Sequence, residues 1–198
     1  MNPVRLSSLA AALVLSAALA AAQQPSPAPQ QQSTANPITQ SYKAFGSRYG
    51  AWLVAAFDSI PASKYSYKPT PAQQSVGYVA QHLEDANYQL CSLFGPTKRT
   101  MTARDSLADT IRAMWPKDTL VARLKASLTF CDNALSGLDD SRLGDMLPVG
   151  PPGSGRQIVR ARAMLAFVTD LADHYSQIAN YMRLNGMLPP SALQRPRM

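Results

Sequence analysis

Apolar side chains recur at spacings of three and four residues through four long segments of the chain, which is the spacing of one face of an α-helix. The segments cover residues 41–60, 75–95, 117–138 and 156–185. Pro61, the pair Gly95–Pro96 and Gly186 stand where three of these runs stop, and residues of these types end helices. Ser75 or a neighbouring residue can cap the second helix. The pattern therefore predicts four long helices.

A shorter helix is predicted within residues 101–116, where Leu107, Ile111 and Met114 share one face. Residues 139–155 are rich in Gly, Pro and Asp and are predicted to form a loop; loops of this length in a compact domain often lie over a site. No segment alternates apolar and polar residues as a strand does. The predicted fold class is all-α, a four-helix bundle.

The ends of the chain differ in composition from the predicted bundle. Residues 1–22 have a short basic segment, an apolar run and an Ala-x-Ala site, the pattern of a secretory signal cleaved after Ala22. Residues 23–39 are rich in Pro, Gln and Ser and are predicted to be a disordered linker. The bundle is expected at 40–192, followed by a tail at 193–198. Because the apolar run is too short and Ala-rich to span a membrane, we expect a secreted or periplasmic protein without stable membrane insertion.

The charge of the chain bears on its partners. Lys and Arg number 19 against 12 Asp and Glu, a net charge of +7, which falls to +6 when the signal and its arginine are removed. The basic residues are scattered, without a run of four or interleaved aromatic residues, so they favour a solvated face over a nucleic-acid site. We expect no nucleic-acid partner; a small-molecule substrate and self-association into a homodimer remain open.

The two cysteines, Cys91 and Cys131, allow two interpretations. In an oxidising compartment they could form a disulfide that closes a loop of about 40 residues. They could equally be two buried free thiols, because Cys packs well as a small apolar residue. Their separation excludes a C-x-x-C redox centre.

The chain contains two histidines, and both fall on predicted helices near an apolar face. His82 borders the apolar stripe of the second helix. Asp170 and His174 are one turn apart on the last helix, so their side chains share a face. Two ligands at i and i+4 with a third from a facing helix can hold a metal ion, and His82, Asp170 and His174 would suit zinc, nickel or iron. The alternative is a histidine satisfied by a hydrogen bond and an ordinary His–Asp pair.

Two stretches of the sequence resemble the DinB/YfiT-like proteins of the DinB superfamily over about residues 40–192. The residues that carry the resemblance are His82-Leu83 and Ala86-Asn87 in the first stretch, and His174-Tyr175, Gln177, Tyr181-x-Arg183, Asn185-Gly186 and Pro189-Pro190 in the second. The resemblance implies a four-helix bundle that binds a divalent metal ion through three histidines. His82 and His174 match two of these positions, and the third is occupied here by Asp170, whose carboxylate can also bind such ions.

The resemblance leaves two functions open. The first is an exported metal-binding bundle that acts as a metal-dependent hydrolase or transferase on an unknown substrate. Family members include transferases that act on low-molecular-weight thiols, but those thiols are cytoplasmic, and the predicted export argues against that activity. The second is a binding or structural module that has lost the metal, in which His82 and Asp170 form an ion pair and residues 139–155 meet a partner. Other catalytic signatures, such as HExxH and GxSxG, are absent from the sequence.

Overall fold

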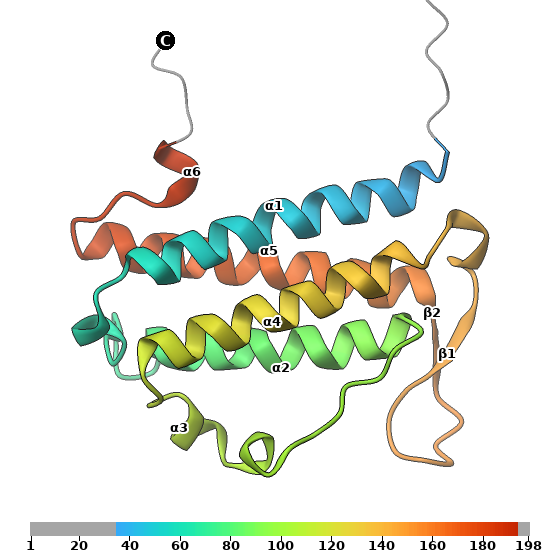
Figure 1. Cartoon of the computed structure of the whole chain (residues 1–198), viewed down its shortest axis with the longest axis horizontal. Helices are drawn as coiled ribbons and strands as arrows, with labels where there is room; N and C mark the ends of the chain where they lie inside the picture. The colour runs from blue at the N-terminus through green and yellow to red at the C-terminus, as the bar shows by residue number, and fades with distance from the viewer. Residues whose placement is uncertain (1–34, 194–198) are drawn as a thin grey trace, which may run out of the picture. The chain divides into compact units, whose positions relative to one another are not determined.

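The computed structural model describes residues 35–193 of the chain (Figure 1). The described part contains four long helices, α1 (Pro37–Ser59), α2 (Val76–Phe94), α4 (Lys117–Ser136) and α5 (Arg160–Leu184). The shorter elements are α3 (Asp109–Arg112), α6 (Pro190–Leu193), β1 (Met146–Pro148), β2 (Gln157–Val159) and short 3-10 helices at Ala62–Lys64, Ala103–Ser106 and Asp140–Arg142. The predicted signal and most of the predicted linker and tail lie outside the described residues.

The four long helices pack into a bundle, in which α2 lies against α4 and α5, and α1 lies against α5 and α4. Figure 1 shows that α2 and α4 run in the same direction, opposite to α1 and α5, because residues 95–116 return the chain along the bundle before α4 begins. The side chains that fill the core come from all four helices and include Leu53, Phe57, Leu83, Phe94, Leu124, Leu135, Met164 and Leu171, each fully buried. The predicted helical bundle is confirmed. Among residues 35–193, no helix combines the length and the apolar character needed to cross a membrane.

The helix α1 begins at Pro37, earlier than the pattern from residue 41 predicts. Its predicted apolar stripe is also imperfect, because Phe45 is 44% exposed. The adjacent face carries Gly46 and Gly50, both buried. A Cβ atom on Gly46 would lie 3.0 Å from the ring of Phe167 on α5. The face of α1 that carries the two glycines therefore packs against the core, and Phe45 lies outside it.

Two predictions made for the connecting segments are wrong. The expected loop at 139–155 contains β1, which pairs antiparallel with β2 in a small two-stranded sheet. The last helix consequently starts at Arg160 and not at Arg156, because residues 157–159 form β2. Each strand has three residues, too few for an alternating pattern to be visible in the sequence.

The predicted short helix is present as α3, but the side chains that mark it in the sequence do not form a buried face, because Leu107, Ile111 and Met114 are exposed by 41%, 47% and 78%. The helix α3 is a single turn, which is too short to bury such a face. It is held instead through Arg112, which is 3% exposed and forms ion pairs with Asp85 on α2 and with the neighbouring Asp109.

A disulfide joins Cys91 on α2 to Cys131 on α4, so the first of the two interpretations of these residues is confirmed. Both residues are fully buried in the core. The bond closes a loop of 40 residues, which the chain-entropy model values at roughly 4 kcal/mol of stability. It ties together the pair of helices that run in the same direction.

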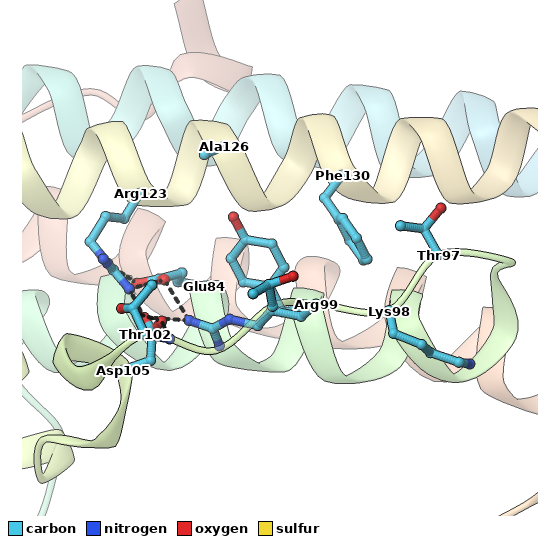
Figure 2. A pocket seen from close by; sticks show the side chains of 11 residues that line it. Glu84, Thr97, Lys98, Arg99, Thr102, Asp105, Arg123, Ala126 and Phe130 are labelled. Carbon is cyan, nitrogen blue, oxygen red and sulfur yellow. Dashed lines mark hydrogen bonds and ion pairs between the residues drawn. The ribbon is translucent and has the colours of Figure 1, made fainter.

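An ionic cluster anchors the returning segment 95–116 to α2 and α4. The cluster comprises Glu84, Asp85, Arg99, Asp105, Arg112 and Arg123, and Figure 2 shows part of it. Glu84 is 1% exposed and accepts hydrogen bonds from Arg123 Nε at 2.7 Å and Arg99 Nη2 at 3.2 Å. Arg99 also donates to Asp105 Oδ1 at 2.7 Å, and its guanidinium lies 4.3 Å from the ring centre of Tyr88.

The cluster borders a cavity of about 450 Å³ between the returning segment and the two helices. Every carboxylate of the cluster is paired with at least one arginine. The buried charges are therefore compensated within the protein, which is the requirement for placing them there. We interpret the cluster as the structural device that fixes the path of residues 95–116.

Acid should weaken the bundle through this cluster. Burial raises the pKa of Asp105, but hydrogen bonds from Thr102 and Arg123 and the charge of Arg99 outweigh it and hold the pKa well below the usual value. A folded-state pKa below the unfolded value gives stability that is present above the unfolded value, near pH 4, and is lost as the pH falls. The stability difference between wild type and Asp105→Asn should therefore shrink from pH 7 to about pH 2, measured by urea unfolding. A constant difference across this range would contradict the assignment.

Candidate metal centre

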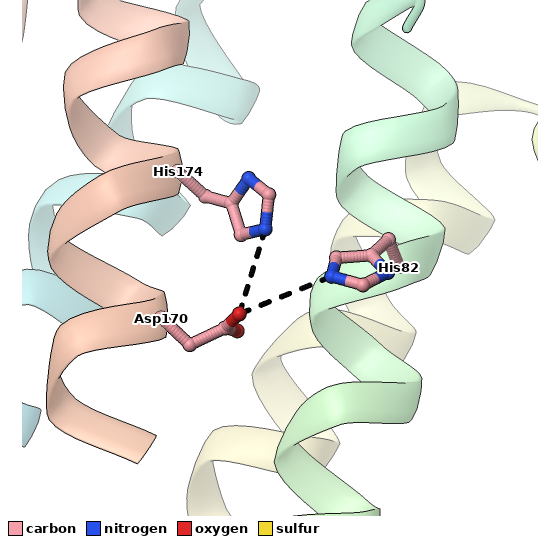
Figure 3. A group of neighbouring side chains, drawn as sticks. All are labelled: His82, Asp170 and His174. Carbon is pink, nitrogen blue, oxygen red and sulfur yellow. Dashed lines mark ion pairs between the residues drawn. The ribbon is translucent and has the colours of Figure 1, made fainter. Parts of the chain in front are cut away.

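The three side chains singled out in the sequence meet at the interface of α2 and α5, as Figure 3 shows. His82 stands between the buried residues Val79 and Leu83 on α2, and its own side chain is 39% exposed. Asp170 and His174 lie one turn apart on α5, with side chains 25% and 12% exposed. The packing of α2 against α5 thus brings all three groups to one flank of the bundle, half covered by the helices.

Their ligating atoms converge on one region of space. Asp170 Oδ1 lies 3.6 Å from His174 Nε2 and 3.9 Å from His82 Nε2, and one ligand atom from each residue lies within 4.8 Å of the others. The two imidazole rings are 4.8 Å apart between centres and meet edge to face, at 69°. Tetrahedral zinc with bonds near 2.0 to 2.1 Å separates its ligand atoms by about 3.3 Å. Small side-chain movements would therefore close the three atoms around one ion.

The remaining oxygen of Asp170 is informative about what the site can hold. Asp170 Oδ2 is buried and has no hydrogen-bond partner among the described residues. A buried carboxylate oxygen without a partner is costly, and a cation supplies the missing interaction. Two imidazoles and one carboxylate are also a donor set of the kind that binds zinc, nickel and iron. The residues present therefore fit a divalent transition metal ion.

The electrostatics of the site favour a negatively charged Asp170. Burial raises the pKa of Asp170, but the interactions with His174 and His82 outweigh burial and lower the pKa to about 2. Burial lowers the pKa of His174, but Asp170 and the hydrogen bond with Gln177 outweigh it and raise the pKa above the usual value. The site is therefore anionic at Asp170 and attracts a positive charge toward the two imidazoles.

The hydrogen-bond partner of His174 is Gln177, to which the sequence analysis assigned no role in the site. Gln177 Oε1 lies 2.9 Å from His174 Nδ1. Gln177 stands three residues after His174, so helical spacing places both side chains on one face. This spacing is the sequence feature from which Gln177 could have been predicted as a hydrogen-bond partner of His174.

Similarity to a known protein family extends over most of the helical bundle. A family model described as the DinB superfamily matches residues 50–178. Comparison with the curated proteins gives no match. The matched range includes His82, Asp170 and His174.

Two solved structures are similar in fold. A DinB-like protein from Bacillus cereus is 18% identical, covers 77% of this chain and 93% of its own, and superposes with a TM-score of 0.59. A conserved protein from Enterococcus faecalis is 15% identical, with 73% of this chain and 94% of its own covered and a TM-score of 0.53. At these identities the likeness establishes the fold.

Proposed function

The chain belongs to the DinB superfamily, and we propose that it binds a divalent transition metal ion through His82, Asp170 and His174. The observation that carries the proposal is the convergence of one ligating atom from each of the three residues to within 4.8 Å of one another, beside a second carboxylate oxygen, Asp170 Oδ2, that is buried without a hydrogen-bond partner in the described structure. An ion pair between His82 and Asp170 alone leaves this oxygen unsatisfied. Zinc, nickel and iron are the candidate ions, since all three accept imidazole and carboxylate ligands.

We propose that the bound ion serves a hydrolase or transferase reaction. A metal ion held by three protein ligands supplies a Lewis acid with positions left for water or a substrate oxygen or sulfur atom. In this chain, His82 is the most exposed of the three ligands, so the open side of the site lies toward solvent on its side. His174 and Asp170 are less exposed and fix the ion from α5.

A cavity of about 570 Å³ borders this part of α5 and is a candidate site for a small-molecule substrate. It shares Gln177 with the hydrogen-bond environment of His174. Its lining also includes Asp173 and Arg183, so both signs of charge are present. We infer that a polar substrate would bind here better than an apolar one.

We also propose that the protein acts outside the cytoplasm. The signal-like pattern of residues 1–22 supports this location. The disulfide between Cys91 and Cys131 supports it independently, because such bonds persist mainly in oxidising compartments.

Metal binding should stabilise the folded protein. A ligand that binds only the folded state at 100 times its Kd adds about 2.7 kcal/mol, which raises the Tm of a domain of this size by roughly 5 to 10 °C. We expect this rise when zinc, nickel or ferrous iron is added to tag-free protein that has been dialysed against a chelator, with magnesium as the control. Differential scanning calorimetry measures it. An unchanged Tm with all three ions would favour the binding module without a metal.

A further inference from the structure

His174 is one end of a chain of hydrogen bonds that leaves the site along α5 and ends in the loop before α2. Gln177 Oε1 lies 2.9 Å from His174 Nδ1, and Gln177 Nε2 donates to Tyr181 Oη at 2.9 Å. Tyr181 Oη in turn donates to the backbone carbonyl of Gln74 at 3.0 Å. The three side chains on α5 occupy positions i, i+3 and i+7, so one helix face carries the whole chain.

The direction of every bond in this chain is fixed from its far end. A carbonyl oxygen only accepts, so the single hydroxyl proton of Tyr181 points to Gln74. The oxygen of Tyr181 can then only accept from Gln177, which requires the amide nitrogen of Gln177 on that side. The amide oxygen consequently faces His174 Nδ1, and this ring nitrogen must carry a proton.

The proton on Nδ1 determines what His174 offers to the site. In the neutral ring the other nitrogen, Nε2, then carries a lone pair, and this atom lies 3.6 Å from Asp170 Oδ1. At 3.6 Å this contact is longer than a hydrogen bond, so the Nε2 lone pair is available to a metal ion. We propose that Gln177 and Tyr181 are positioning residues that hold His174 as the Nδ1–H tautomer and so present its Nε2 lone pair to the metal ion. The proposal rests on the proposed function of the site.

Burial and packing hold Tyr181, the middle member of this chain of hydrogen bonds, in place. Tyr181 is 2% exposed, and its ring meets Tyr67 edge to face at 6.0 Å between ring centres. The loop that carries Gln74 is joined to α2 through Ser75, whose side chain accepts a hydrogen bond from the backbone of Tyr78. The acceptor that sets the direction of the whole chain is thus held by the same helix that carries His82.

The test compares Gln177→Leu with Gln177→Glu in tag-free protein. Leucine cannot accept from Nδ1, whereas glutamate can, so the second variant should rescue what the first one loses. In metal-free wild type, nitrogen-15 NMR of the neutral imidazoles should show the Nδ1–H tautomer at His174, and Gln177→Leu should show a mixture of tautomers. The chain has two histidines, so a His82→Gln variant assigns both sets of signals.

Zinc affinity, measured by competition with a chromophoric chelator, should fall by about 10- to 100-fold in Gln177→Leu, the usual effect of removing a hydrogen-bond partner of a ligating histidine. Gln177→Glu should stay within a few fold of wild type, as should the control Asn180→Ala, which changes an exposed residue of the same helix. The zinc affinity of Tyr181→Phe should lie between those of Gln177→Leu and wild type. Without the tyrosine hydroxyl, the side-chain amide of Gln177 is free to rotate and exchange the positions of its oxygen and nitrogen atoms.

The outcomes separate this inference from the proposed function. An Nε2–H tautomer in wild type would overturn the inference, whatever the metal affinity. Equal zinc affinities for wild type and Gln177→Leu would also overturn it, while leaving the metal site in place. Failure of wild type to bind zinc, nickel or iron would overturn the proposed function, and with it the role of Gln177 toward a metal.

Discussion

Replacement of His174 by alanine should lower zinc affinity by on the order of 1,000-fold, which corresponds to about 4 kcal/mol of binding free energy. The expected loss is large because His174 is the least exposed of the three groups and faces Asp170 at 3.6 Å. Without it, one imidazole and one carboxylate remain, and the imidazole is on the exposed side of the site. Isothermal titration calorimetry and elemental analysis of tag-free protein measure the loss.

The control for this experiment is Ser176→Ala, two residues further along α5, where the side chain is exposed. It should bind zinc as wild type does. Far-UV circular dichroism should show the same helix content for both variants, since His174 lies at the edge of the core and not within it. If wild type and His174→Ala both contain negligible metal, the proposed metal site is wrong. The result would then favour a helical bundle that has kept the fold and lost the metal.

The sequence predicted the bundle because its helices bury continuous apolar stripes. The buried side chains of Leu83, Leu124 and Leu171 all lie on stripes with helical spacing, and such spacing has one simple structural meaning. The hairpin of β1 and β2 was missed because three residues per strand carry no readable period. The pairing of Cys91 with Cys131 could not be decided, since a separation of 40 residues is equally compatible with free thiols.

The candidate site was predictable in its members but not in its surroundings. Asp170 and His174 are related by local helical spacing, and a scarcity of histidines made His82 the natural third member. The unpartnered oxygen of Asp170 depends on how α2 and α5 pack, which no local pattern records. The partners of Glu84 were out of reach for the same reason, because Arg99 and Arg123 lie 15 and 39 residues away along the chain.

The second large effect is expected from Glu84→Gln, which should reduce the free energy of unfolding by about 3 kcal/mol. Glu84 is 1% exposed and receives hydrogen bonds from both Arg99 and Arg123. Without the charge of Glu84, the positive charges of the two arginines are only partly neutralised where little water reaches them. Removing one partner of a buried ion pair in this way is strongly destabilising. Urea unfolding followed by circular dichroism measures the change.

An exposed ion pair provides the comparison that makes this result specific. Lys125 and Asp58 are 3.0 Å apart with side chains about half exposed, so Lys125→Ala should cost less than about 1 kcal/mol. A double-mutant cycle of Glu84→Gln with Arg123→Met should give a coupling energy above about 1 kcal/mol, because the two residues share hydrogen bonds at 2.6 and 2.7 Å. If Glu84→Gln destabilises the protein no more than Lys125→Ala does, residues 95–116 are held by something other than this cluster.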